Sequence, residues 1–177
     1  MYSAEDLLLR DCEEDDIPSI TAIYGRAVLT GFGTFEIVPP SEAEMKIRWR
    51  RAMIDHYPFI VAEDNRKILG FAYASAYRLR PAYDNTVENS VYVRDGFQGR
   101  GIGTRLLSRL VAEAAGLDYR QMVAVIGDSN NKGSIKLHEK LGFSLIGTMP
   151  SVGWKHGRWL DTVLMQRALG PGDTTPA

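Results

Sequence analysis

The segment from Thr86 to Gly103, TVENSVYVRDGFQGRGIG, constrains this chain more than any other. Its first half alternates and is rich in β-branched residues, which predicts a strand. Its second half carries Gly99, Gly101 and Gly103 at alternate positions, directly before an amphipathic helix. The amides at a helix start have no partner inside the helix, and together with the helix dipole they favour an anion. The segment therefore predicts a site for a phosphate or pyrophosphate, and the alternative is a tight turn without a ligand.

The bulk composition is that of a globular protein, with 177 residues, 45% hydrophobic, 24% charged and a net charge of −1. We expect one domain over residues 1–170 and a disordered tail over 171–177. The balanced charge gives no reason to expect nucleic acid or a membrane as a partner. One cysteine, Cys12, leaves no internal disulfide, and the acids before the first apolar run do not resemble a signal peptide, so we expect a cytoplasmic protein.

Hydrophobic periodicity predicts seven strands and four helices. The order is one strand, two helices, three strands, a helix, a strand, a helix and two strands, which indicates a mixed α/β domain with a central sheet and helices on both faces. The predicted strands are 7–10, 59–63, 68–78, 86–93, 122–126, 143–154 and 158–169, and the predicted helices begin near Asp16, at Ser41, after Gly103 and near Asn130 or Asn131.

Glu88 interrupts the strand before the glycine turn. Strand alternation places it on one face with Thr86, Ser90 and Tyr92, opposite a face that holds Val87 and Asn89. A carboxylate inside a strand is unusual unless it is paired, exposed or functional. Its position upstream of the anion site favours catalysis, and the alternative is a solvated face of an edge strand.

Two further kinds of side chain are candidates on the residues alone. His138 lies on the helix after Asn131, where a histidine beside an apolar face can be structural or catalytic. Arg78 and Arg80 precede Glu88 and suit a bidentate contact to a carboxylate, although they can equally be solvated. The segment GWKHGRWLD can be a hairpin with Trp154 and Trp159 in the core.

Several familiar sites are excluded by their missing motifs. The sequence has no GxxxxGK[ST] phosphate loop, and its glycines are spaced GxGxG rather than GxGxxG. It has no HExxH or paired Cys/His spacing, so no metal site is expected. It has no GxSxG, and Cys12 stands beside acids that disfavour a thiolate.

QGRGIG, from Gln98 to Gly103, resembles the acyl-CoA-binding motif of the GCN5-related N-acetyltransferases (GNAT family). NKGSIKLHEKLGF resembles the later Asn–helix–GF segment of that family. Four stretches, GTFE, RPAYDNTVENSVYV, LHEKLGF and GWKHGRWLD, are similar to its phosphinothricin and methionine sulfoximine or sulfone acetyltransferases. They run in order from about Thr34 to Leu169. The stretch from Ile126 to Ser134 looks one residue longer than in the herbicide-resistance members, so Asn130 and Asn131 remain alternatives.

The resemblance implies a GNAT-like mixed sheet whose strands splay to form an acyl-CoA cleft, with acetyl-CoA as cofactor. It implies a homodimer. The sequence adds physical support, because Phe32, Phe35 and Trp49 lie on or near predicted loops and helices that can line a shared substrate mouth. The resemblance also implies that Glu88 is a general base for direct attack by an α-amino group and that His138 protonates or hydrogen-bonds the leaving thiolate. The cofactor residues it implies are Val91, Tyr92, Val93, Gln98, Gly99, Arg100, Gly101, Ile102, Gly103, Thr104, Asn130, Asn131 and Ser134.

Under that resemblance the substrate is a small amino-acid analogue. Its carboxylate suits Arg78 or Arg80, with Tyr83 beside them, and its compact tetrahedral end suits Phe35, Glu36 and Lys155. Two alternatives remain: acetylation of a protein N-terminus, a lysine or a polyamine by the same machinery, and a CoA-binding domain without catalysis. The presence of both Glu88 and His138 argues against the second.

Overall fold

The computed structural model describes residues 7–176, and all of its strands belong to one seven-stranded sheet in the order β1-β2-β3-β4-β5-β7-β6. The strands are β1 (Leu8–Asp11), β2 (Phe59–Asp64), β3 (Lys67–Ala76), β4 (Thr86–Val93), β5 (Gln121–Gly127), β6 (Ser144–Lys155) and β7 (Arg158–Ala168). The helices are α1 (Ile17–Thr30), α2 (Glu42–Ile54), α3 (Ile102–Gly116) and α4 (Lys132–Lys140), with short 3₁₀ turns η1 (Glu14–Asp16) and η2 (Pro81–Tyr83). The predicted order of elements and the mixed α/β class are confirmed.

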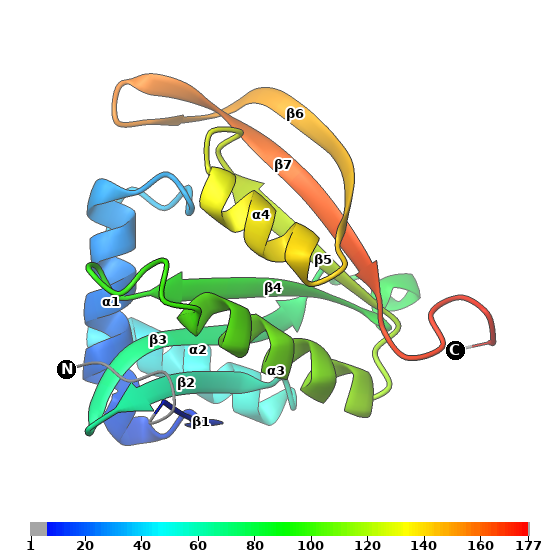
Figure 1. The fold of residues 1–177 in the computed structure, drawn as a ribbon, viewed down its shortest axis with the longest axis horizontal. Helices are drawn as coiled ribbons and strands as arrows, with labels where there is room; N and C mark the ends of the chain where they lie inside the picture. Colours follow the sequence, from blue (N-terminus) through cyan, green and yellow to red (C-terminus); the bar gives the residue numbers. More distant parts are fainter. Residues whose placement is uncertain (1–6, 177) are drawn as a thin grey trace.

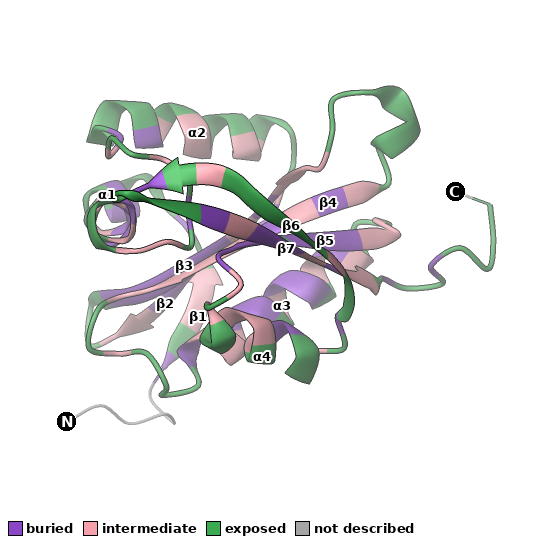
Figure 2. Ribbon diagram, turned by 90° about the horizontal axis from the view of Figure 1, so that it is seen from above, coloured by how far each residue is buried: buried purple, intermediate pink, exposed green. Residues whose placement is uncertain are grey.

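The sheet separates two pairs of helices. Helices α1 and α2 cover one face, and α3 and α4 lie on the other, as Figures 1 and 2 show from two directions. All neighbouring strands are antiparallel except β4 and β5, which run parallel. The layers follow from one-sided burial, because each helix has a single apolar face to cover.

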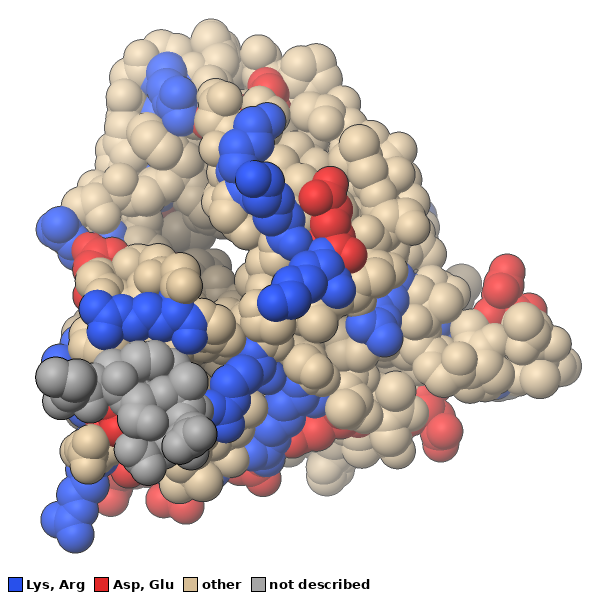
Figure 3. All heavy atoms as spheres, viewed as in Figure 1, with Lys and Arg blue, Asp and Glu red and all other residues tan. Residues whose placement is uncertain are grey.

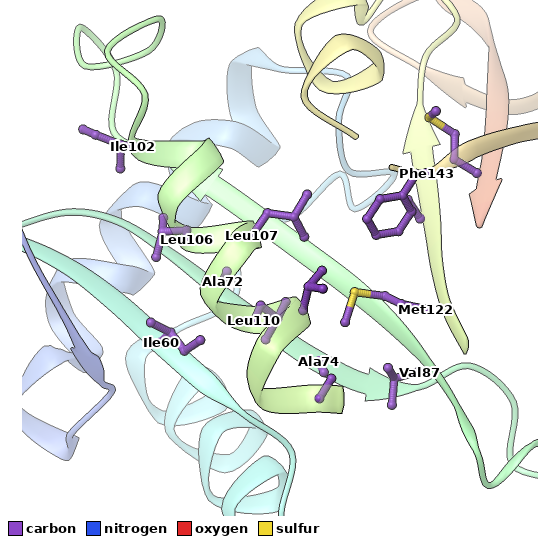
Figure 4. Close-up of a cluster of buried hydrophobic side chains, with 14 of the residues drawn as sticks. Ile60, Ala72, Ala74, Val87, Ile102, Leu106, Leu107, Leu110, Met122 and Phe143 are labelled. Carbon is purple, nitrogen blue, oxygen red and sulfur yellow. The ribbon is translucent and has the colours of Figure 1, made fainter. Parts of the chain in front are cut away.

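The larger core lies between α3 and the sheet. Leu106, Leu107 and Leu110 are fully buried and face the strands, including Ile60 and Ala72 (Figure 4). Small residues on β3 let the helix approach closely, since leucine side chains fill the space above them. The glycine turn at the start of α3 is therefore anchored on a rigid element.

The second core lies under α1 and α2. Ser41 caps α2 by accepting a hydrogen bond from the Glu44 amide at 3.2 Å, as the capping pattern predicts. Trp49 packs against this core and donates from Nε1 to the Cys12 carbonyl. Trp49 therefore holds α2 to the start of the domain, although its position in the sequence suggested a place near a substrate mouth.

The two parallel strands, β4 and β5, diverge about halfway along their length. β4 pairs with β5 only from Thr86↔Gln121 to Asn89↔Ala124, yet β4 continues to Val93 and β5 to Gly127. Beyond Asn89, no strand within residues 7–176 pairs with the β5 side of β4. This splay is the point in the sheet where a ligand can enter.

The expectation that Trp154 and Trp159 lie in the core is wrong. They form an edge-to-face pair near the tip of the β6–β7 hairpin, and they are 59% and 62% exposed. The hairpin formed by β6 and β7 projects beyond the helices (Figures 1 and 2). The spacing of the two tryptophans fits a cross-strand pair, which sequence alone cannot distinguish from a core pair.

The end of the chain packs on β5 as far as it is described. Leu169 is buried, and the Arg120 guanidinium donates to the carbonyl groups of Gly172 and Pro176. Disorder of residues 171–177 stays a prediction. Between residues 7 and 176 no helix is both long and apolar enough to cross a membrane.

Candidate active site

A cleft of about 620 Å³ opens where β4 and β5 diverge. Its walls are the end of β4, the glycine turn, the start of α3 and one side of α4. Eleven of the thirteen residues proposed for cofactor binding line it: Val91, Tyr92, Val93, Gln98, Gly99, Gly101, Ile102, Gly103, Thr104, Asn131 and Ser134. Arg100 and Asn130 do not. The splay and the glycine turn therefore form one site.

The glycine turn needs glycine for its backbone. Gly101, the N-cap of α3, has φ of 81°, a left-handed conformation that other residues adopt only with strain. The first helical backbone bond joins the Arg105 amide to the Gly101 carbonyl at 3.0 Å. Within the described chain, the amides of Ile102, Gly103 and Thr104 are thus left for a ligand at the cleft wall.

Gln98 braces this turn from outside. Its Oε1 accepts from the Gly96 amide at 2.9 Å, and its Nε2 donates to Asp95 and to the Val93 carbonyl. Asp95 is in turn held by Arg26 of α1 at 2.8 Å. The side chain of Gln98 therefore shapes the turn, while its surface still lines the cleft.

Basic side chains stand around the opening of the cleft. Lys136 and Lys140, on consecutive turns of α4, both line it, and Figure 3 shows Lys and Arg side chains on either side of an opening in this face. The backbone amides at the start of α3 and the ammonium groups of Lys136 and Lys140 together complement a ligand with several phosphates. The fit is therefore to a phosphorylated cofactor.

Asn131 resolves the choice between the two asparagines as far as capping is concerned. Its Oδ1 accepts from the Ser134 amide at 3.2 Å, and its Nδ2 donates to the Gly127 carbonyl at 3.0 Å. Asn130 is exposed and lies outside the cleft. Asn131 therefore ties the start of α4 to the end of β5.

Glu88 faces a second hollow, of about 280 Å³, on the α1 side of β4. The two hollows share Gly33, Ser90, Tyr92 and Val125, so they meet at the splay. The carboxylate of Glu88 is half-buried, and the described residues give it no hydrogen bond or ion pair. Burial raises the pKa of Glu88, and the Arg78 guanidinium partly opposes that rise. An unpaired carboxylate of raised pKa is suited to accept a proton.

Three tyrosines form much of the second hollow, and two of them, Tyr24 and Tyr73, were not predicted as site residues. Tyr24, Tyr73 and Tyr92 line it, and burial raises the pKa of all three, that of Tyr24 to about 12. Their phenols therefore stay neutral around Glu88. The alternating aromatic residues of β3 and β4 were the signal available in the sequence, and the antiparallel pairing of Tyr73 with Ser90 brings these two faces together.

His138 is buried and lines the inner part of the larger cleft. Its Nδ1 contacts the Ser134 carbonyl at 2.8 Å, and its Nε2 contacts the Asn89 Oδ1 at 3.0 Å. Burial lowers the pKa of His138, and the bond to Ser134 raises it. His138 and Glu88 thus lie on opposite faces of β4, one on each hollow.

The loop from Gly31 to Pro40 closes over the second hollow. The Phe35 ring packs where side chains on Gly127 and Gly153 would collide with it, so both glycines are required by its close approach. Lys155 is 2% exposed and donates from Nζ to the Thr34 carbonyl. Burial lowers the pKa of Lys155. Phe35 lines the hollow, whereas Lys155 supports the loop from behind.

The remaining substrate candidates lie outside both hollows. Glu36 is paired with Arg48 at 2.7 Å. Arg78, Arg80 and Tyr83 are exposed in and before the η2 turn, although Arg78 is near enough to influence Glu88. The structure therefore does not bring the two arginines into the hollow beside Glu88.

Alternative chemistries find no support in the described residues. Burial raises the pKa of Cys12 to about 12, which leaves it a poor nucleophile. Residues 7–176 contain no cluster of three or more His, Cys, Asp or Glu side chains placed to hold a metal ion. The chemistry suggested by the geometry is proton transfer beside a phosphate-binding cleft.

Comparisons with known proteins identify the class of enzyme to which this splayed sheet and its phosphate-binding cleft belong. Residues 18–143 match the model of the acetyltransferase (GNAT) family. The chain is 48% identical to a phosphinothricin N-acetyltransferase of Alcaligenes faecalis, over 94% of this chain and 85% of that one. It is 39% identical to an L-methionine sulfoximine/L-methionine sulfone acetyltransferase of Pseudomonas aeruginosa, over 95% and 98%.

A solved structure shows the same architecture. The phosphinothricin acetyltransferase of Sinorhizobium meliloti, crystallised with acetyl-CoA, superposes with a TM-score of 0.94 at 49% identity, over 97% of this chain and 92% of that one. The chain belongs to the GNAT family of acetyltransferases. It is an enzyme that transfers an acetyl group, and acetyl-CoA is its donor.

Proposed function

We propose that this enzyme acetylates the α-amino group of small amino-acid analogues of the phosphinothricin, methionine sulfoximine or methionine sulfone type. The observation that carries the proposal is Glu88, an unpaired carboxylate of raised pKa in a small hollow that meets the cofactor cleft. The named activities of the relatives support the substrate class. The hollow, at about 280 Å³, suits a substrate of amino-acid size.

The cofactor would rest on the chain's own amides and lysines. The amides of Ile102, Gly103 and Thr104 would hold the pyrophosphate, with Lys136 and Lys140 beside it. The backbone of β4 beyond Asn89, which lacks a partner on the β5 side, would bind the pantetheine arm like an added strand. When bound, acetyl-CoA supplies an acetyl group activated as a thioester.

Glu88 would act as general base, directly or through a water. An α-amino group is mostly protonated at neutral pH, and it becomes a nucleophile only after losing a proton. The raised pKa of Glu88 brings its basicity closer to that task. Direct attack by the amine needs no covalent enzyme intermediate, because both reactants are held together at the splay.

Groups on the side of β4 that faces the larger cleft would stabilise the thioester oxygen and the leaving thiolate. A backbone N–H of β4 beyond Asn89 is free on the β5 side to stabilise developing charge on the thioester oxygen. His138, at the inner part of the cofactor cleft, would protonate or hydrogen-bond the departing thiolate. Base and acid would then lie on either side of one strand.

Substrate selection would involve the mouth of the second hollow. Phe35 lines the hollow and would pack against the side chain of the analogue. Arg78, which acts on Glu88 electrostatically, is the better candidate of the two arginines for the substrate carboxylate. Lys155 would act by supporting the loop that carries Phe35.

The enzyme would function as a cytoplasmic homodimer. The β6 edge strand and the hairpin tip present an apolar surface consisting of Leu145, Ile146, Met149, Val152, Trp154 and Trp159, each at least 45% exposed. Such a surface suits an interface. Light scattering should give twice the chain mass at micromolar concentration, and a monomer would exclude this arrangement. The buried, unreactive Cys12 is compatible with the cytoplasm.

The alternative substrate is a protein N-terminus, a lysine or a polyamine; membership of the acetyltransferase family argues against CoA binding without catalysis. One assay separates them: CoA release and product mass are measured with phosphinothricin, methionine sulfone and methionine sulfoximine, with the amine left by decarboxylating methionine sulfone, and with a peptide and a polyamine. The amino-acid analogues should react best, each gaining one acetyl group on its α-nitrogen. If the peptide, the polyamine or the decarboxylated amine reacts better, the proposed substrate class is wrong. If none of these amines reacts, the proposal that the second hollow binds and activates an amine is rejected.

A further inference from the structure

The nearest polar atom to each ring nitrogen of His138 is an oxygen that can only accept a hydrogen bond, and the Ser134 hydroxyl lies farther from Nδ1, at 3.5 Å. The Ser134 carbonyl lies 2.8 Å from Nδ1, and the Asn89 Oδ1 lies 3.0 Å from Nε2. A neutral imidazole carries only one N–H, and its other nitrogen presents a lone pair. Satisfying both contacts therefore requires a proton on each nitrogen.

The orientation of the Asn89 amide follows from its second partner. Its Nδ2 donates to the Val123 carbonyl of β5 at 3.1 Å. Rotating the amide would bring Oδ1 against that carbonyl, and two acceptors would repel one another inside the core. Asn89 is only 6% exposed, so water does not readily replace either bond. The parallel pairing of β4 with β5 thus aims the amide oxygen at His138.

We propose that Asn89 is a positioning residue that keeps a proton on Nε2 of His138 at the inner part of the cofactor cleft. Both side chains line that cleft. The use of this proton rests on the proposed function: the N–H bond at Nε2 breaks as an S–H bond forms on the departing thiolate, and solvent in the cleft then returns a proton to Nε2. Nδ1 keeps its own proton throughout and donates it to the Ser134 carbonyl.

Among the described residues, no charged side chain is a cause of the pKa shift of His138. The groups that face its ring are Asn89 from β4, Ser134 from its own helix, and the Phe143 ring, edge-to-face at 5.0 Å between centroids. Lys136 and Lys140 of α4 line the same cleft, and Glu88 faces the other hollow. Burial lowers the pKa of His138, and the bond from Nδ1 to the Ser134 carbonyl opposes that effect. The Asn89 oxygen adds a second acceptor, at Nε2, which should favour the protonated ring in the same direction.

Glu88 and Asn89, which are consecutive on β4, would then have complementary roles in the reaction. Glu88 faces the substrate hollow as the base, and Asn89 faces the cofactor cleft as the support of the acid. Alternation of side chains along β4 produces this division without any loop. The two β4–β5 pairs at these positions are the last before the splay, where the reacting groups would meet.

Two substitutions test the role of Asn89. Asn89→Leu keeps the approximate shape but removes the acceptor, and Asn89→Asp keeps an acceptor and adds a charge. The measurement is a ¹⁵N NMR titration of His138 in the enzyme without ligand. We expect the pKa of His138 to fall by about one unit in Asn89→Leu and to rise in Asn89→Asp. Nε2 should change from protonated to lone-pair type at lower pH in Asn89→Leu than in the unmodified enzyme.

Val87→Ala is the matched control, because Val87 is buried on the same face of β4 and its side chain has no polar atom that could bond to the His138 ring. It should lower thermal stability without moving the titration. In the pH profile of kcat, the alkaline limb should move to lower pH in Asn89→Leu only. An unchanged titration of His138 in Asn89→Leu overturns the inference. Because the titration needs no substrate, inactivity toward every amine would reject the proposed function and leave this test intact.

Discussion

The buried ammonium group of Lys155 donates a hydrogen bond of 2.7 Å to the backbone carbonyl oxygen of Thr34, 121 residues earlier in the chain. The bond joins the end of β6 to the loop over the second hollow, and the Phe35 ring in its slot between Gly127 and Gly153 joins them again. Two distant segments thereby hold one wall of the proposed substrate site.

Lys155→Met should loosen that wall while keeping the buried stem. A hydrogen bond from a charged donor contributes about 1.5–3 kcal/mol, so KM for the amine should rise roughly tenfold or more. Acetyl-CoA affinity should be unchanged, since Lys155 does not line the larger cleft. Steady-state kinetics with Lys132→Met as an exposed-lysine control measures the effect. An unaltered KM would mean that the loop is held without this bond.

Gly101→Ala should weaken acetyl-CoA binding. Gly101 lines the cleft, has φ of 81°, and has nothing within 4 Å of an added Cβ. Gly96→Ala is the matched control, because Gly96 has φ of 80° and equally open surroundings but lies outside the cleft. Each change costs about 1–2 kcal/mol of backbone strain. Calorimetry should show a loss of affinity for Gly101→Ala well beyond that for Gly96→Ala. Equal losses would place the pyrophosphate elsewhere.

Arg78→Ala should move the acidic limb of the kcat/KM profile to higher pH. The Arg78 guanidinium opposes the burial-driven rise in the pKa of Glu88, so its removal lets that pKa rise further. Arg80→Ala is the natural comparison, because Arg80 is also exposed and is not among the causes of the Glu88 shift. If Arg78 also binds the substrate carboxylate, KM should rise in the same variant. If the pH profile moves equally in both variants, the shift comes from the loss of one positive charge in this region and not from Arg78 specifically.

Glu88→Gln should stabilise the fold at neutral pH. The folded-state pKa of Glu88 is raised, so the native state binds more protons than the unfolded state between the ordinary glutamate pKa and the raised value. Stability therefore falls as pH rises through that window, and the penalty persists above it. Thermal melts should give Glu88→Gln the higher Tm at pH 7 and no advantage below about pH 4. A lower Tm at pH 7 would show that the carboxylate stabilises the native state.

Local patterns were sufficient for most of the architecture. The alternation of β4, the glycine turn and the leucines of α3 are short-range features, and each appears where periodicity predicts it. An asparagine cap at the start of α4 could be predicted for the same reason, because the Asn131 side chain and the Ser134 amide that it accepts from are only three residues apart. Glu88 and His138 were singled out from position and resemblance, and the structure places them on either side of β4.

Long-range contacts account for what sequence reasoning missed. The partner of Lys155 lies 121 residues away, and the tyrosines around Glu88 come together only through strand pairing. Trp154 and Trp159 were misplaced because an aromatic pair has the same spacing on an exposed hairpin as in a core. Asn89 stands out in the sequence as a polar residue on an otherwise apolar face of β4. Its role could not be predicted, because it depends on a contact with His138, 49 residues later.

The most direct test of the account is the kcat of Glu88→Gln with methionine sulfone and acetyl-CoA at neutral pH, measured on protein that is folded and still binds acetyl-CoA. Removing a general base typically lowers the rate about 10²- to 10⁴-fold, and we expect a loss in that range. A kcat equal to that of the unmodified enzyme would contradict the central claim that Glu88 takes the proton from the attacking amine.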